Sequence, residues 1–370
     1  MPTLAIFGRH PQLELGFNGA MSYYEALAFL EQGWDVTLLL PTSQASDPVA
    51  ALARKGFRSF SELDLGDRIA IRPITPETTF DTPFDVLIWQ TYNQHDEPYW
   101  KAMRAAARVT TKSQPRLFTG ELKRDTGAGV GTSKRFDLVA LALRDDYGYA
   151  RRNGFFGRPR SGFAYVPRGV SPDLLNPSGK TAAPSIGFDR AIDPADGGAA
   201  AVAHIVELVG RLRQQWPELQ VYQVGTTAHV EGAKLVSYRP MKDFYDAFIN
   251  KIWVYVSFDF RHSIHAKTMV THPSGRRVGL GLYENQMIEA QMSGALLAAG
   301  LMDTPAELFA PQWGSLRYPD HDHADAIHKV VRTGLQNFHA LSPKARDFAL
   351  ANHTYSRMGQ IWNDALRRLL

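Results

Sequence analysis

Short apolar runs alternate with amphipathic segments along this chain of 370 residues. Apolar runs bounded by turn residues are typical of strands that helices cover on both faces of a sheet. The predicted strands are residues 3–7, 35–40, 84–89, 116–119, 136–143, 164–167, 185–188, 219–224, 234–238, 252–258 and 295–299. Helical patterns separate many of them, including residues 20–31, 100–109 and 201–216. The alternation predicts an α/β fold with doubly wound parallel sheets.

The length of the chain allows two domains of ordinary size, each with its own core. A stretch rich in Pro, Gly and Ser interrupts the alternation at mid-chain and is typical of a linker. We therefore expect an N-terminal Rossmann-like domain over residues 1–168, a linker over residues 169–184 and a C-terminal domain over residues 185–355.

The composition excludes some chemistry and leaves several partners open. The chain has no cysteine, which rules out disulfides, thiol catalysis and cysteine-ligated metals. It has neither a run of about 18 apolar residues nor the features of a signal peptide, so we expect an intracellular, cytoplasmic protein, with a phage-encoded one as an option. The net charge of +4 suits an anionic donor, peripheral contact with an anionic membrane, or nucleic acid.

Residues 278–300 form the most informative stretch. A loop leads into a predicted helix at Glu284, which ends near Gly294 and is followed by an apolar run. The N–H groups at the start of such a helix favour a phosphate. Glu289 can accept hydrogen bonds from a pair of neighbouring hydroxyl groups. The alternative is an ordinary surface helix with two solvated acids.

This stretch resembles the donor-site segment of GT-B glycosyltransferases, especially the retaining family 4. The family pattern is an acid, seven residues, a second acid and then Ala-Met-Ala-x-Gly; residues 289–294, EAQMSG, match its second half, but Gly281 stands where the first acid belongs. The resemblance implies that Glu289 binds the nucleotide ribose and that Glu284 or a nearby basic side chain replaces the first acid. The donor-binding candidates here are Gly281, Tyr283, Glu284, Asn285 and Glu289.

Two further segments are similar to the same family. Residues 165–171, YVPRGVS, resemble its interdomain segment, and residues 186–190, IGFDR, place Arg190 where the family has a diphosphate-binding Arg. The position of the accompanying Lys falls on Ala195 or Asp196. The resemblance implies that Arg190 is a catalytic residue that stabilises the leaving diphosphate. It also implies that the final helix, residues 356–370, packs back on the first domain.

A long basic loop, residues 259–278, precedes the donor segment. Its cationic candidates for the missing part of the diphosphate clamp are Arg261, Lys267, Arg276 and Arg277. Loops of this length in a compact domain are usually functional or disordered. The same charges would attract a polyanionic acceptor such as DNA, and a solvated surface loop is the alternative.

The first domain offers weaker candidates. Gly16, Asn18 and Gly19 lie between the first strand and helix, where glycine lets the backbone approach a donor, although a plain turn is the alternative. His95 and Glu121 follow predicted strands and could contact the sugar or orient the acceptor as catalytic residues; solvated loop residues are the alternative.

Two apparent motifs fail on closer reading. Residues 127–134, GAGVGTSK, lack the Gly-Lys-Ser/Thr order of a P-loop. Histidines 262, 265 and 272, and the run 320–323, suggest metal ligands, but GT-B enzymes generally bind their donor without a metal. We therefore expect no metal and no cofactor beyond a UDP- or GDP-linked sugar as donor substrate.

Together with the α/β pattern, the resemblance implies a GT-B fold with an interdomain cleft. The expected function is hexosyl transfer from a nucleotide-diphosphate sugar, with retention, to a glycan, a lipid-linked glycan or a modified DNA base. One alternative is a sugar-nucleotide epimerase of the same fold. Another is a non-catalytic GT-B protein that binds nucleic acid or a protein partner.

Overall fold

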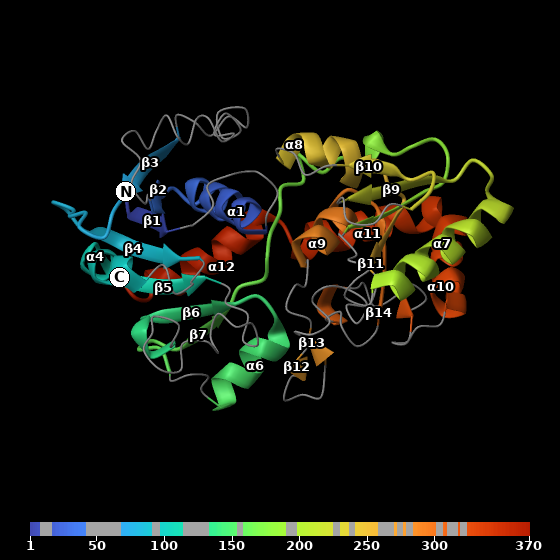
Figure 1. The fold of residues 1–370 in the computed structure, drawn as a ribbon. Helices are drawn as coiled ribbons and strands as arrows, with labels where there is room; N and C mark the ends of the chain where they lie inside the picture. Colours follow the sequence, from blue (N-terminus) through green and yellow to red (C-terminus); the bar gives the residue numbers. More distant parts are fainter. Residues whose placement is uncertain are drawn as a thin grey trace. The chain divides into compact units, whose positions relative to one another are not determined.

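The structure is a computed structural model that divides into two compact units. Unit 1 comprises Met1–Gly169 and Tyr355–Leu370, and unit 2 comprises Val170–Thr354. The residues that the structure describes are 1–7, 17–41, 68–90, 97–113, 133–153, 158–189, 198–224, 230–236, 241–257, 270–271, 277–278, 284–300, 306–308, 317–318 and 324–370. Each unit is built around its own parallel sheet (Figure 1).

Unit 1 contains a seven-stranded parallel sheet in the order β3-β2-β1-β4-β5-β6-β7. Its strands are β1 (Thr3–Phe7), β2 (Asp35–Pro41), β3 (Ile69–Ile74), β4 (Phe84–Trp89), β5 (Ala107–Ser113), β6 (Leu138–Leu141) and β7 (Phe163–Tyr165). Its helices are α1 (Phe17–Glu31), α4 (Glu97–Ala105), the 3-10 turn η2 (Ser133–Arg135), α6 (Arg144–Asn153) and α12 (Tyr355–Arg367). The strand order reverses between β1 and β4, which makes their carboxyl ends the expected ligand-binding edge.

The core of unit 1 is rich in aromatic side chains. Phe7 and Trp89 stack with ring centroids 4.2 Å apart, and Tyr99 of α4 packs on Phe7. The last helix, α12, packs along α1 in the same unit (Figure 1). Gly359 allows this approach, because a Cβ atom there would lie 2.7 Å from the Ala28 carbonyl oxygen.

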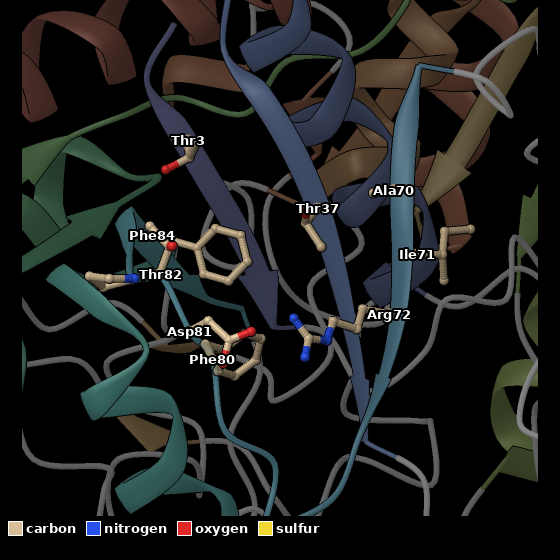
Figure 2. A pocket seen from close by; sticks show the side chains of 10 residues that line it. Thr3, Thr37, Ala70, Ile71, Arg72, Phe80, Asp81, Thr82 and Phe84 are labelled. Carbon is tan, nitrogen blue, oxygen red and sulfur yellow. The ribbon is translucent and has the colours of Figure 1, made fainter.

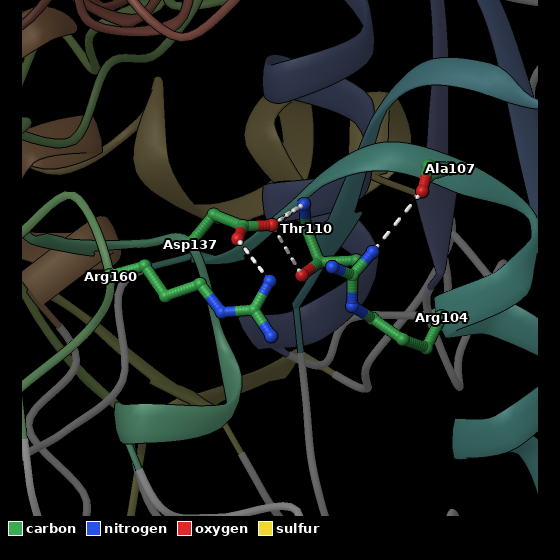
Figure 3. Close-up of polar contacts among 5 residues, drawn as sticks. All are labelled: Arg104, Ala107, Thr110, Asp137 and Arg160. Atoms are coloured by element: carbon green, nitrogen blue, oxygen red, sulfur yellow. Dashed lines mark hydrogen bonds and ion pairs between the residues drawn. The ribbon is translucent and has the colours of Figure 1, made fainter.

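Aspartates near the amino ends of β4 and β6 hold neighbouring strands of unit 1 together. Asp137 accepts hydrogen bonds from the Thr110 backbone N–H at 2.7 Å and the Thr110 hydroxyl at 3.0 Å, and it pairs with Arg160 (Figure 3). Asp85 makes the same kind of contact with the N–H and hydroxyl of Thr3. These acids therefore serve the sheet and lie away from its carboxyl edge.

Unit 2 contains a six-stranded parallel sheet in the order β10-β9-β8-β11-β14-β15. Its strands are β8 (Ser185–Asp189), β9 (Gln220–Val224), β10 (Lys234–Val236), β11 (Val254–Ser257), β14 (Leu296–Gly300) and β15 (Arg317–Tyr318). Its α-helices are α7 (Gly198–Gln215), α8 (Met241–Phe244), α9 (Glu284–Met292), α10 (Ala324–Gln336) and α11 (Phe338–Asn352). The strand order reverses here between β8 and β11.

Shorter elements complete unit 2. They are the 3-10 turns η3 (Pro177–Gly179) and η8 (Ala306–Leu308), the π-turn η5 (Tyr245–Ile249) and the antiparallel pair β12 (Val270–Thr271) and β13 (Arg277–Val278). Gly187 in β8 lets η5 pack closely on the sheet. A Cβ atom at Gly187 would lie 2.6 Å from Ile252 and 2.7 Å from Phe248.

The predicted α/β class, with two doubly wound parallel sheets, is confirmed. The predicted helix over residues 100–109 is wrong at its end, because α4 stops at Ala105 and residues 107–113 form β5. Val109, Thr110 and Thr111 are β-branched and favour an extended backbone beside β4. The predicted strand over residues 116–119 lies outside the described residues.

Candidate functional site

Glu289 is the predicted site residue whose surroundings the structure describes most fully. It lies on α9 with 2% of its surface exposed, so it is not a solvated acid. The Tyr245 hydroxyl donates a hydrogen bond of 2.5 Å to Oε1 of Glu289. A carboxylate buried this deeply requires donors around it, and Tyr245, itself 0% exposed, supplies one.

The carboxyl-terminal end of α9 follows the predicted pattern. Gly294 has φ of +79°, the left-handed conformation that commonly ends a helix. The N–H of Ala295 bonds to the carbonyl of Ala290 at 2.8 Å, and β14 begins at Leu296. The helix therefore turns sharply into a buried strand, as the small residues there predict.

The π-turn η5 lies beside α9 and is joined to it at two places. Tyr245, its first residue, bonds to Glu289, while the carbonyl of Ile249, its last residue, accepts a hydrogen bond of 3.1 Å from the Ser293 hydroxyl. The N–H of Asn250 bonds to the carbonyl of Tyr245 at 2.7 Å, which closes the wide turn. Single π-turns occur frequently at functional sites.

Two basic side chains, Lys180 and Arg346, hold the end of α9 and the neighbouring turn. Lys180 donates hydrogen bonds to the Ile249 carbonyl at 3.0 Å and the Ser293 hydroxyl at 2.8 Å. Arg346 of α11 donates to the carbonyls of Met292, the last residue of α9, and Leu175. Burial, reinforced by the positive charge of Arg346, lowers the pKa of the Lys180 ammonium well below its usual range.

A second buried polar cluster lies at the carboxyl ends of β4 and β5 in unit 1. Glu25 of α1 is 1% exposed and accepts hydrogen bonds from Ser113 Oγ and from Gln90 Nε2, the latter at 2.5 Å. Lys112 Nζ donates to the Gln90 carbonyl at 2.9 Å. Burial raises the pKa of Glu25, against the opposing effects of these hydrogen bonds and of the nearby positive charges of Arg168 and Lys112.

This cluster marks the strand ends from which the candidate catalytic segments depart. Gln90 directly follows β4 and precedes the segment containing His95, whereas Ser113 ends β5 and precedes the segment containing Glu121. Glu25 and Lys112 were not predicted from the sequence. The usable signals were a lysine inside a strand that contains Val109, Thr110 and Thr111, and an acid among the apolar residues of a helix.

A cavity of about 590 Å³ lies elsewhere in unit 1, beside β1, β2 and β3 (Figure 2). Arg72 extends over the Phe80 ring, with its guanidinium carbon 4.4 Å from the ring centroid. Thr3 and Thr37, from the amino-terminal halves of their strands, also line it. Among the residues that the structure describes, no predicted site residue lines this cavity.

The remaining predicted site residues are only partly described, or lie outside the described residues. Those outside them are Gly16, His95, Glu121, Arg190, Arg261, Lys267, Arg276, Gly281 and Tyr283. The backbone alone is described for Asn18 and Gly19 in α1, Arg277 in β13, and Glu284 and Asn285 in α9. Strand β8, one of the two strands at the reversal point of unit 2, ends at Asp189, directly before Arg190.

The described residues show neither a cluster of metal ligands nor a helix that could cross a membrane. Within the described ranges, no three His, Asp or Glu side chains are grouped so that they could hold a metal ion. In the same part of the chain, every helix is too short or too polar to cross a membrane.

Comparison with solved structures identifies the fold of this chain. No protein-family model matches the sequence. A search of curated protein sequences also finds no match. Solved structures do match along the whole chain. A glycosyltransferase from Rickettsia africae superposes with a TM-score of 0.62 at 11% identity, covering 100% of this chain and 98% of the other.

Two further structures sharpen the comparison. The pneumococcal O-GlcNAc transferase GtfA, solved with UDP and GlcNAc, has a TM-score of 0.63 at 8% identity and covers 100% of this chain and 99% of its own. The fold is GT-B. UDP-GlcNAc 2-epimerase from Neisseria meningitidis, solved with UDP-GlcNAc, has a TM-score of 0.56 at 9% identity with full coverage of both chains. The GT-B fold of this chain is therefore shared with both transferases and an epimerase.

Proposed function

We propose that this chain is a glycosyltransferase that takes a sugar from a nucleotide-diphosphate donor, with UDP as the first nucleotide to test. The observation that carries the proposal is Glu289, a buried carboxylate held by Tyr245 on the helix that precedes β14. A carboxylate can accept hydrogen bonds from both hydroxyls of a ribose. The GT-B fold and the matched structures solved with UDP or UDP-GlcNAc support this assignment.

In this proposal, three parts of unit 2 share the donor. Glu289 binds the ribose, the backbone N–H groups at the start of α9 face the phosphates, and Arg190 at the end of β8 stabilises the leaving diphosphate. Arg190→Ala should then lower the turnover rate more than it weakens donor binding, because the negative charge on the diphosphate grows as the glycosidic bond breaks. A change confined to KM would contradict the transition-state role.

The direct test of the activity is a donor panel. Calorimetric titration with UDP, GDP and their sugars should show binding to the wild-type protein, and binding to Glu289→Ala should be at least about tenfold weaker. Hydrolysis or transfer of the sugar should follow with the donor that binds. Neutral glycans, lipid-linked glycans and DNA with a hydroxylated base are then offered as acceptors, and retention is read from the anomeric configuration of the product.

A sugar-nucleotide epimerase is the second candidate, because an epimerase shares the fold over the full chain. Incubating a UDP-sugar without acceptor distinguishes the two reactions. An epimerase should invert the configuration at one carbon of the sugar, with either a nucleotide-linked or a free sugar as the product. A transferase should leave the UDP-sugar intact or hydrolyse it slowly without changing that carbon. Failure of every nucleotide to bind would favour a non-catalytic protein with this fold.

A further inference from the structure

We infer that Tyr245 is a positioning residue that fixes the orientation of the Glu289 carboxylate toward the donor ribose. This inference rests on the proposed function, since it assigns a role at the same site. The phenol of Tyr245 and the carboxylate of Glu289 come from elements separated by 44 residues and meet at 2.5 Å. A hydrogen bond to a charged acceptor at this distance is of the stronger class.

The surroundings of Tyr245 make it a rigid donor. Its side chain is fully buried, and its ring centroid lies 6.3 Å from that of Phe244. The π-turn that it begins is closed by the bond from Asn250 N–H to the Tyr245 carbonyl. Asn250 is buried as well, and its side chain bonds to the Leu174 carbonyl at 3.1 Å and accepts from the Asn176 N–H at 2.9 Å.

The helix that carries Glu289 is fixed relative to this turn. Ser293 on the segment after α9 bonds to the Ile249 carbonyl, while Tyr245 bonds to Glu289, so the two elements are joined at both ends of the π-turn. Lys180 bonds to both Ile249 and Ser293. Neither backbone can then shift much without breaking these bonds, and the direction of the phenol O–H is set by the fold.

A fixed phenol has a specific consequence for Glu289. A glutamate side chain rotates about several bonds, and ordering it on ligand binding costs free energy. A hydrogen bond to Oε1 restricts the rotation of the carboxylate before the ligand arrives. The carboxylate has two oxygens with several lone pairs, so one phenol does not saturate it. Preorganisation of this kind raises affinity for the group that is recognised, here the ribose diol.

The experiment compares UDP with 2′,3′-dideoxyuridine diphosphate, which lacks both ribose hydroxyls, by calorimetric titration of the full chain. Wild-type protein should prefer UDP by about tenfold or more. Tyr245→Phe keeps the ring and removes the donor. It should reduce the preference for UDP by about three- to tenfold and leave the affinity for the dideoxy compound unchanged. If Tyr245 had a purely structural role, Tyr245→Phe would instead weaken the binding of both compounds equally.

Tyr255→Phe is the matched control. Tyr255 is also buried, and its hydroxyl lies 3.4 Å from Oε1 of Gln286 on the same helix. Removing the Tyr255 hydroxyl should leave the preference for UDP over the dideoxy compound unchanged. Glu289→Asp provides a second test if Tyr245→Phe does not fold, because the shorter side chain withdraws the carboxylate from Tyr245. It should also lose the preference for UDP.

The outcomes separate the inference from the proposed function. If Glu289→Gln abolishes the preference and Tyr245→Phe or Glu289→Asp retains it, the positioning role is overturned while the ribose site stands. If the wild-type protein binds neither compound, or Glu289→Gln keeps the wild-type preference, the proposed ribose site fails and the positioning role fails with it.

Discussion

Each unit of this protein buries a glutamate on one of its helices, but the two are held in different ways. Glu25 in unit 1 accepts hydrogen bonds from side chains at the ends of β4 and β5, with two cations nearby. Glu289 in unit 2 accepts a hydrogen bond from the phenol of Tyr245 on a neighbouring π-turn.

The difference indicates that burial alone does not specify what a carboxylate does. The partners of Glu25 belong to the sheet, so losing Glu25 should mainly reduce the stability of the fold. The described partner of Glu289 belongs to a turn that is anchored independently through Asn250 and Ile249, so losing Glu289 should mainly reduce donor binding. The following predictions test this contrast, beginning with the largest expected effect.

Glu25→Leu should lower the free energy of unfolding by about 3–5 kcal/mol, because it leaves the buried charges of Lys112 and Arg168 without this carboxylate. Urea denaturation measures the change. Glu31→Leu, which replaces an exposed acid on the same helix, is the matched control and should change stability by less than about 0.5 kcal/mol. Equal effects at the two positions would remove the stabilising role assigned to Glu25.

Glu289→Ala should raise the donor dissociation constant at least about tenfold, since charged hydrogen bonds contribute about 1.5–3 kcal/mol each. The protein should remain folded, with a smaller loss of stability than Glu25→Leu. Titration and urea denaturation of the same preparation measure both quantities. If Glu289→Ala loses as much stability as Glu25→Leu and binds donor normally, the two glutamates have the same structural role and the contrast is wrong.

Arg346→Met should lower the free energy of unfolding by about 1–3 kcal/mol, because the carbonyls of Met292 and Leu175 lose a charged donor. Lys344→Met, an exposed cation on the same helix, is the control and should have little effect. A large loss of stability in Arg346→Met would show that the contacts at the end of α9, rather than Glu289, stabilise this part of unit 2. An unchanged unfolding curve would contradict this assignment of the stabilising role to the end of α9.

The pH dependence of stability should distinguish Glu25 in a finer way. Burial raises its folded pKa above the ordinary value of 4.5, so the folded protein retains the proton to higher pH than the unfolded chain does. Its contribution to stability is therefore full below the ordinary pKa and declines as pH rises through the raised folded pKa. Glu25→Gln cannot ionise and should remove this decline. If stability changes with pH in the same way in the wild-type and variant proteins, Glu25 has an ordinary pKa in the fold and the prediction is wrong.

Local sequence patterns determined much of the architecture. Continuous apolar runs predicted most of the parallel strands, because strands covered on both faces have few polar positions. The small residues at 293–294 predicted the end of α9, and Gly294 adopts the positive φ that such an end requires. The same reasoning failed at residues 107–113, where pairing with β4 and β6 selects a strand over continuation of α4.

Only the tertiary structure decided which polar side chains meet. Tyr245 and Glu289 are 44 residues apart, and Glu25 lies 65 residues from Gln90 and 88 from Ser113. Periodicity reports which face of an element is apolar, but it does not report which elements become neighbours. That depends on the strand order and on how closely helices approach the sheet, as at Gly187, where the missing Cβ atom makes room for the π-turn. The sequence therefore marked Glu289 as a candidate, and the packing of η5 against α9 supplied its hydrogen-bond donor.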